Sequence, residues 1–352
     1  MRPIRNSSGA RLMLLAFLAI VLAGSVIDTR QTRVASTTAT TAERDIDLFS
    51  AVVARVRAGE RYYDAMGTEL RQRRYPTASV FNWRTPLLYS AIAAIGPGSV
   101  HAVLVCLALA LLVLTVVVLG KRHAAPLMAG LFVQVGAVVA VMVSSATLLT
   151  EAWAGVLLAL SVCAYQMRAW RTAAGLGLLA LFVRELAAPY VVICAFLALR
   201  NKRWDEVTIW SAGALAYSIY FGWHVHEVRA LQGPGDLAQA YSWLYGGGPA
   251  FLLRTLRTNA WLLVSPPWIP SASGLLAILL AACAWTHTAP HLRATVLVYV
   301  VMFIIVGQPF NYYWGLLTAP TWALVTADGV DALRHWLAIA RQPRLGPDIS
   351  LS

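Results

Sequence analysis

The chain has 352 residues, of which 59% are hydrophobic and 12% are charged, and its mean hydropathy is +0.65. Soluble globular domains carry about 25% charged residues, so this composition excludes an ordinary water-soluble enzyme and favours an integral membrane protein. The formal net charge is +12 and comes almost entirely from arginine, which suits both anionic lipid and phosphate groups.

The N-terminus is basic, and an apolar stretch follows it. Residues 12–27 read LMLLAFLAIVLAGSVI. This pattern fits either a secretory signal, with a weak cleavage site at 23–25, or an uncleaved anchor. We favour the anchor, because the later spans need this one to complete their topology.

A polar loop of residues 28–86 comes next. In it, Phe49, Val52, Val53 and Val56 recur at helical spacing, which predicts an amphipathic helix over 46–58. Asp45 is the expected N-cap of this helix, and Gly59 is its expected end. A second short helix is predicted from the four-residue spacing of Tyr62, Met66 and Leu70. Helices of this kind lie on the bilayer surface.

The rest of the chain is apolar almost to its end. Only helices satisfy the backbone in lipid without closing a barrel, and these apolar stretches are longer than barrel strands. We therefore predict an all-α polytopic membrane bundle, a single transmembrane domain of residues 1–352. The predicted spans, about ten in number, are 11–27, 98–119, 124–143, 147–167, 172–183, 186–199, 207–223, 271–285, 294–307 and 314–327.

Short basic loops set the expected orientation, because positive loops stay in the cytoplasm. The N-terminal arginines, the loop at 121–122, the loop at 200–203 and the C-terminal tail all fall on one side. Both termini are therefore predicted to be cytoplasmic. The loops 28–86 and 224–270 then face the opposite side of the membrane.

Cysteine and histidine give no metal-ligand pattern. The four cysteines all lie within apolar stretches, where free cysteine packs as a small hydrophobe. His224 and His226 are two residues apart and would not share a helix face. We expect neither a metal nor a cofactor.

Three groups of polar residues are candidates for chemistry. Asp45 or Asp47 could act as a general base on a sugar hydroxyl, although either also suits the start of a helix. Arg184 and Glu185 interrupt an apolar hairpin. They form either a turn at the lipid–water interface or a phosphate clamp with its orienting carboxylate.

The third group is the polar and aromatic turn at 308–314, which contains Asn311 and Tyr312. Aromatic faces with amide groups suit a sugar or a lipid headgroup, and they equally suit an interfacial belt. Glu151, at the predicted start of the fourth span, is most simply a polar contact within the bundle.

Several motifs together resemble the glycosyltransferase-C superfamily, in particular bacterial mannosyltransferases that use polyprenyl-phosphate mannose. The motifs are DLF at 47–49, GERYYD at 59–64, FNWRTPL at 81–87 and NYY at 311–313 before Pro320. The resemblance covers the first loop well and the middle of the chain hardly at all. The chain departs from the family in its short length, in lacking an evident soluble C-terminal domain, and in reading Arg-Thr-Pro where a tyrosine–proline pair is usual.

The resemblance implies an inner-membrane glycosyltransferase of the cell envelope. Asp47 matches the position of the catalytic base, and Asp45 is the reserve, because the motif can also be aligned two residues earlier. The donor would be a polyprenyl-phosphate sugar, and the acceptor a glycan or lipid approaching from the periplasm. Beyond the membrane lipids no other partner is expected, and nucleic acid is not one. The residues expected to bind substrate are Arg184, Glu185, Arg74, Arg84, Tyr63, Asn311 and Tyr312.

The main alternative is a transporter or flippase for a lipid or an anion. Transporters tend to have internal repeats and helices broken near the midplane of the membrane. The sequence shows no clear repeat, but the hairpin at 172–199 keeps this alternative open. An acyltransferase or polymer ligase acting on the same kind of lipid, and a non-catalytic membrane subunit, are further alternatives.

Overall fold

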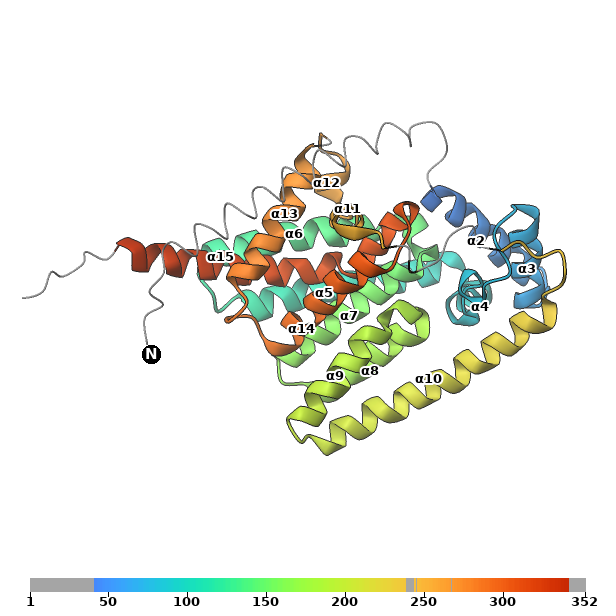
Figure 1. Ribbon diagram of the computed structural model, residues 1–352, viewed down its shortest axis with the longest axis horizontal. Coiled ribbons are helices and arrows are strands. Elements are labelled where there is room, and N and C mark those ends of the chain that lie inside the picture. Colours follow the sequence, from blue (N-terminus) through green and yellow to red (C-terminus); the bar gives the residue numbers. More distant parts are fainter. Residues whose placement is uncertain (1–40, 239–243, 245, 267, 342–352) are drawn as a thin grey trace, which may run out of the picture.

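The computed structural model describes residues 41–341 apart from 239–243, 245 and 267 (Figure 1), so the predicted span 11–27 lies outside the described residues. Within the described part every regular element is helical, which confirms the prediction of an all-α fold. The first half contains α2 (Thr41–Arg57), α3 (Tyr62–Gln72), η1 (Val80–Asn82), α4 (Pro86–Ile95), α5 (Pro97–Leu119), α6 (Ala124–Val141), η2 (Ser144–Leu148), α7 (Thr150–Gln166) and α8 (Trp170–Val183). The second half contains η3 (Glu185–Ala187), α9 (Ala188–Arg200), α10 (Trp204–Leu231), α11 (Gly248–Thr255), α12 (Ala260–Leu263), α13 (Trp268–Cys283), α14 (Pro290–Ile305), η4 (Pro309–Leu317) and α15 (Ala319–Arg341).

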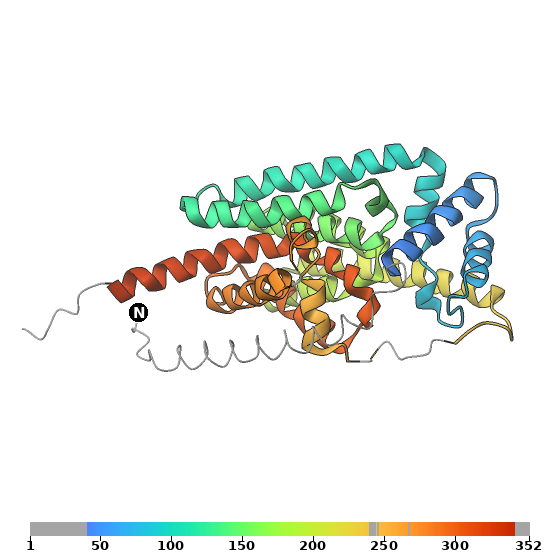
Figure 2. The same ribbon diagram turned by 90° about the horizontal axis from the view of Figure 1, so that it is seen from above.

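Helix α7 is the centre of the bundle. Nearly all of its side chains are buried, and it packs on α5, α8, α15 and η4. Helix α15 lies along α6 and α13, while the long α10 runs outside α8 and α9 and reaches α3 (Figure 1). Helices α2, α3 and α4 gather at one end of the molecule (Figure 2). The first polar loop therefore covers one end of the bundle.

Most predicted spans correspond to helices of similar bounds, and the clearest differences lie near the C-terminus. The predicted spans 98–119 and 124–143 match α5 and α6 closely. Helix α10 is longer than the predicted 207–223 at both ends. The predicted last span of 314–327 is wrong at both ends, because η4 occupies 309–317 and α15 continues to Arg341.

Two helices of the described residues, α5 and α6, are long and apolar enough to cross a membrane, and shorter apolar stretches occur in α8, α13 and α14. The bundle also exposes many large apolar side chains. Examples are Val113, Val117, Met128, Phe132, Val192, Phe196, Leu215 and Ile219. Ordinary soluble monomers rarely expose large contiguous apolar patches.

The apolar face of α2 is used inside the protein. Leu48, Phe49, Val52 and Val53 are buried, and α2 packs on α3, α4 and η4. The expectation that this face lies on a bilayer surface is therefore wrong. As expected, the helix ends just before Gly59, whose φ of +97° is one that glycine adopts without strain.

The prediction that Asp45 caps α2 is also wrong. The helix already begins at Thr41, so the backbone of Asp45 lies inside it. Residues 45, 48, 49, 52 and 53 follow the i, i+3, i+4, i+7 spacing of one helix face. Asp45 is thus a carboxylate on a face whose other members are buried and apolar.

A polar latch joins the end of α10 to the first loop. The carboxylate of Asp236 accepts hydrogen bonds from Arg71 Nε at 2.9 Å, from Thr77 Oγ1 at 2.7 Å and from the Gly233 amide at 2.9 Å. The backbone amides of Thr77 and Ala78 both donate to the carbonyl of Leu237. This latch holds the segment that leads to Arg84.

Replacing Asp236 with asparagine is expected to destabilise the latch by about 1.5–3 kcal/mol, the usual range for hydrogen bonds to a charged group. The hydrogen bond from Arg71 is the largest contribution that lowers the pKa of Asp236, to about 2. A lowered pKa means that the stabilisation is present above the ordinary value of 3.8 and disappears as pH falls toward about 2. Hydrogen exchange at the amides of Thr77 and Ala78, compared with the surface control Asp64→Asn, measures the loss. Equal protection in both variants at pH 7 would contradict this role.

Candidate active site

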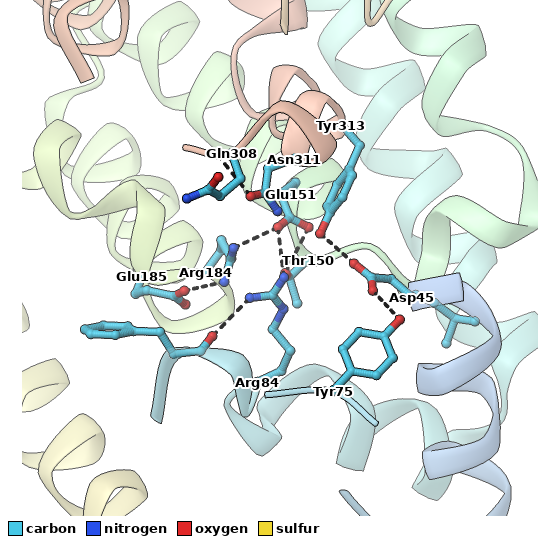
Figure 3. Close-up of polar contacts among 12 residues, drawn as sticks. Asp45, Tyr75, Arg84, Thr150, Glu151, Arg184, Glu185, Gln308, Asn311 and Tyr313 are labelled. Atoms are coloured by element: carbon cyan, nitrogen blue, oxygen red, sulfur yellow. Dashed lines mark hydrogen bonds and ion pairs between the residues drawn. The ribbon is translucent and has the colours of Figure 1, made fainter. Parts of the chain in front are cut away.

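Five segments that are far apart in the sequence meet at one end of α7 (Figure 3). They are α2, the loop before α4, the first turn of α7, the turn between α8 and α9, and η4. Each contributes one or more polar side chains to a common cluster. The cluster lies where the first polar loop covers the bundle.

Asp45 is the carboxylate that α2 contributes, and it is 6% exposed. Its two carboxylate oxygens each accept a hydrogen bond from a tyrosine hydroxyl, Tyr75 at 2.8 Å and Tyr313 at 2.6 Å. Burial raises the pKa of Asp45 above its ordinary value, while the hydrogen bond from Tyr313 and the charge of Arg84 oppose this rise. Asp45 is therefore an oriented carboxylate of increased basicity. A general base requires both of these properties.

Beside Asp45, two guanidinium groups converge on one carboxylate. Glu151 Oε1 lies 2.9 Å from Arg184 Nη2 and 3.6 Å from Arg84 Nη2. Arg184 also forms an ion pair with Glu185. Glu151 and Arg184 are each only 1% exposed, so the pair is well shielded from water. A lone charge at this depth would be costly, and each group therefore depends on its partners.

Local sequence explains how Arg84 is oriented. Pro86 forces the preceding residue out of the helical region, and Thr85 is extended, so the chain enters α4 through a short straight segment. The carbonyl of Arg84 accepts a 2.6 Å hydrogen bond from Tyr62, and its guanidinium lies 5.8 Å from the centre of the Phe49 ring. Both α2 and α3 therefore fix this arginine.

Arg184 is oriented by the break in its hairpin. It has extended backbone angles between α8 and η3, and its guanidinium lies 5.8 Å from the centre of the Trp314 ring in η4. Glu151 lies in the first turn of α7, where the helix dipole favours negative charge. The ionic cluster thus links α7, the hairpin turn and η4.

Close backbone packing positions η4, which provides Tyr313. A Cβ atom on Gly155 would lie 2.0 Å from the carbonyl oxygen of Leu316, and one on Gly315 would lie 1.9 Å from that of Thr255. Only glycine allows such approaches. The first turn of η4 is closed by reciprocal capping between Gln308 and Asn311. Tyr313 is therefore held on a segment that leaves little freedom of movement.

The cluster retains unused hydrogen-bonding capacity. The Nε atoms of Arg84 and Arg184 are buried and have no hydrogen-bond partner in the structure. Buried donors of this kind are costly unless a ligand or water satisfies them. Arginine forks are well suited to phosphate, but the two arginines here are already paired with Glu151 and Glu185. A phosphate would therefore bind as an additional ligand to the unused donors or displace one carboxylate.

The structure brings together five of the residues expected from sequence. Asp45, Arg84, Arg184, Glu185 and Asn311 all lie in the cluster (Figure 3). Asn311 acts there through the cap of η4, because its Oδ1 accepts a 3.3 Å hydrogen bond from the Gln308 amide.

The other four expected residues lie elsewhere. Asp47 is exposed on the face of α2 opposite Asp45, and Arg74 is exposed in a left-handed turn with φ of +56°. Tyr63 forms a 3.0 Å hydrogen bond with His224 Nδ1 of α10. Tyr312 is half-buried, and its carbonyl accepts a 3.4 Å hydrogen bond from Thr258. These positions argue against a direct part in the cluster.

Sequence reasoning missed Tyr75 and Tyr313 and undervalued Glu151. The helical spacing of α2 was enough to indicate Asp45, because Asp45 lies on the apolar face of the helix and Asp47 does not. Tyr313 directly follows Tyr312 in the aromatic turn, so the predicted motif includes the tyrosine that donates to Asp45. No local pattern indicates Tyr75, since it is brought to Asp45 by the packing of α3 on α2.

Comparison of the chain with protein-family models, with curated proteins and with solved structures found no match. The geometry of the cluster is therefore the basis for any assignment of function.

Proposed function

We propose that the protein is a polytopic membrane glycosyltransferase that uses a polyprenyl-phosphate sugar as donor. The membrane assignment is supported by the low content of charge, by the apolar α5 and α6, and by the large apolar side chains that cover the outside of the bundle. The proposal includes the ten predicted spans, the cytoplasmic termini and a periplasmic position for the Asp45 cluster.

The enzymatic proposal is carried by one observation: a carboxylate suited to act as a base lies beside two buried guanidinium groups. Asp45 is a buried carboxylate of raised pKa that is oriented by two tyrosines. Two buried arginines with unused Nε donors lie beside it. Asp45 therefore replaces Asp47 as the proposed base, since Asp47 is exposed on the other face of α2.

In the proposed reaction, an acceptor hydroxyl oxygen attacks the anomeric carbon of the donor sugar. Asp45 takes the hydroxyl proton as the new carbon–oxygen bond forms. The bond between the anomeric carbon and the phosphate oxygen breaks, and the polyprenyl phosphate leaves with one more negative charge. Arg84 and Arg184 stabilise this growing charge. Attack from the face opposite the phosphate inverts the anomeric configuration.

A transfer assay on the purified chain in lipid vesicles tests whether the protein is a glycosyltransferase. Polyprenyl-phosphate mannose, glucose and arabinose, each radiolabelled, are offered with total bacterial membrane lipid and glycan as acceptors. The proposal predicts that label from at least one donor moves into a new product. If every donor is recovered intact across the whole acceptor panel, the proposal is wrong.

The Tyr313→Phe variant is expected to move the acidic limb of the pH–rate profile to higher pH. The hydrogen bond from Tyr313 lowers the pKa of Asp45, so its removal raises that pKa further. Activity that needs ionised Asp45 is then lost at a higher pH as the solution is acidified. Tyr190→Phe is the matched control, because it removes a buried 2.7 Å contact with Ser161 away from the cluster. An acidic limb at the same pH in both variants would separate Tyr313 from the base.

One observation favours the transporter alternative. Helices α8 and α9 have 14 and 13 residues, so each is only about 20 Å long at 1.5 Å per residue. Their hairpin turns at the buried Arg184, which is the type of charged break that transporters place at a binding site. Counterflow of labelled polyprenyl phosphate across vesicles, without any new product, would favour this alternative over the transferase.

A further inference from the structure

A polar cavity lies far from Asp45, at the end of the bundle away from α2 and α3 (Figures 1 and 2). It is found where the turn between α5 and α6 and the turn between α13 and α14 meet α15, and its volume is about 430 Å³. The polar side chains that line it are His123, His287, Asp331, Arg334 and His335. The lining thus combines one guanidinium and three imidazoles with a single carboxylate, so groups that can donate a hydrogen bond predominate.

Basic side chains outnumber acidic ones around this cavity. The carboxylate of Asp328 pairs with Arg122 at 2.5 Å, and the exposed Lys121 precedes that arginine in the turn between α5 and α6. Arg334 is exposed on α15 and forms no ion pair within the part of the chain that the structure describes. The region therefore keeps a net positive charge even after Asp331 is counted, and this charge favours an anionic ligand.

His287 and His335 lie close enough together to contact the same ligand. Their ring centres are 6.2 Å apart, with the ring planes inclined by 66°, and they come from the turn before α14 and from α15. Arg334 precedes His335 and lines the same cavity. Imidazole and guanidinium N–H groups form hydrogen bonds of about 2.9 Å to oxygen, and arginine is well suited to phosphate. These three side chains therefore form a donor set for one phosphate group.

The aromatic and apolar side chains next to the cavity suit the level of the lipid headgroups. Trp285 is exposed in the turn before α14, and Trp336 is exposed on α15 together with Leu333 and Leu337. Tryptophan is enriched where a bilayer meets water. The turn between α5 and α6 also connects two helices that are long and apolar enough to cross a membrane. In the proposed membrane, the cavity therefore opens at the lipid–water interface.

We infer that this cavity binds the phosphate headgroup of an anionic phospholipid, such as phosphatidylglycerol, from the surrounding bilayer. Arg334, His287 and His335 hold the phosphate, and the acyl chains lie along the exposed Leu333 and Leu337 of α15. Anionic lipids attract basic groups on the cytoplasmic side of a membrane, where this end of the bundle is predicted to lie. The inference rests on the membrane part of the proposed function and not on sugar transfer, because the Asp45 cluster lies at the other end.

Three variants test the charges of the cavity. Arg334→Ala should weaken binding of phosphatidylglycerol by at least about ten-fold, because it removes charge-assisted hydrogen bonds to the phosphate. Asp331→Asn should strengthen binding, because it removes the one carboxylate that repels the phosphate from within the cavity, and damage to the fold does not produce a gain of affinity. Arg200→Ala is the matched control and should bind like the wild type. Arg200 is exposed at the end of α9 on the same predicted side of the membrane, outside the cavity.

The test is native mass spectrometry of the full chain in detergent, titrated separately with phosphatidylglycerol, phosphatidylcholine and inorganic phosphate. We expect the wild type to bind phosphatidylglycerol at least about five-fold more tightly than phosphatidylcholine, since each basic group near a membrane surface favours anionic lipid by this factor. Inorganic phosphate should neither saturate the wild type nor displace the bound lipid.

Equal affinity of the wild type for the two phospholipids would overturn the inference. Equal losses in Arg334→Ala and Arg200→Ala would also overturn it, because they would show diffuse attraction in place of a site. Weaker binding in Asp331→Asn would contradict an anionic ligand, and displacement of the lipid by inorganic phosphate would identify a site for the free ion. A chain that stays soluble and monodisperse after removal of the detergent would instead refute the membrane assignment itself.

Discussion

The Asp45→Asn variant is expected to lower the rate of sugar transfer by at least about 100-fold, because a positioned general base contributes typically 10²–10⁴-fold. Asp47→Asn is expected to leave the rate within about two-fold of the wild type. The two residues share one helix, one side-chain chemistry and one loop, and they differ in the face that they occupy. The comparison therefore isolates the position of the carboxylate.

Loss of activity in Asp45→Asn should not come from unfolding. The raised pKa of Asp45 shows that burial disfavours its charged form, so above the ordinary pKa its ionisation reduces the stability of the fold. A neutral asparagine of the same size removes this cost and still offers an oxygen to one tyrosine. The melting temperature of the variant should equal or exceed that of the wild type at pH 7. A fully active Asp45→Asn, or an inactive Asp47→Asn, would refute Asp45 as the base.

Replacing Glu151 with alanine is expected to cause the largest loss of stability among single substitutions in the cluster, about 3–5 kcal/mol. The change leaves Arg84 and Arg184 buried without the carboxylate that lies 3.6 Å and 2.9 Å from them. It also frees the hydroxyl of Thr150, which donates to Glu151 at 3.2 Å. Unfolding in mixed detergent, followed by tryptophan fluorescence, measures the change in free energy.

Two further variants distinguish the cost of leaving a buried charge unpaired from a loss of stability that any carboxylate substitution would cause. Glu227→Ala removes a half-exposed carboxylate 4.0 Å from Arg61, and such surface pairs contribute about 1 kcal/mol or less. The double variant Glu151→Ala/Arg184→Ala removes one of the two uncompensated charges. It should therefore be more stable than the sum of the single losses predicts. Additive losses would show that the two residues do not interact.

The bundle could be predicted from sequence because its helices are marked by long apolar stretches. The predicted ranges for α5, α6, α8 and α9 follow the observed helices closely, since the helical period and the flanking charges are local signals. The start of α15 was missed because η4 is also apolar and aromatic. Hydropathy does not distinguish its tight turns from the first turn of a longer helix.

The packing of α2 places Asp45, and not Asp47, in the polar cluster. The apolar residues of α2 were identified correctly, and the helical spacing already grouped Asp45 with them. The resemblance to glycosyltransferase-C motifs favoured Asp47 because of its distance along the chain from the tyrosine-rich segment at 59–64. The structure shows that the buried face carries Asp45, together with Leu48 and Phe49.

The remaining members of the cluster depend on long-range contacts that no local pattern encodes. Tyr313 and Asp45 are separated by 268 positions in the chain and meet because η4 packs between α2 and α7. Glu151 looked like an ordinary polar residue at the start of an apolar helix. The loop before α4 and the turn after α8 each direct an arginine toward it, and both segments are distant from Glu151 in the sequence.

The most direct test of the central proposal is a cryo-EM structure of the protein in nanodiscs with a non-cleavable polyprenyl-phosphonate sugar. The proposal predicts the phosphonate within hydrogen-bonding distance of the Nε atoms of Arg84 and Arg184. The anomeric carbon should then face a channel that leads an acceptor hydroxyl to Asp45. A sugar headgroup bound at any site that Asp45 and both arginines do not contact would contradict the proposed active site.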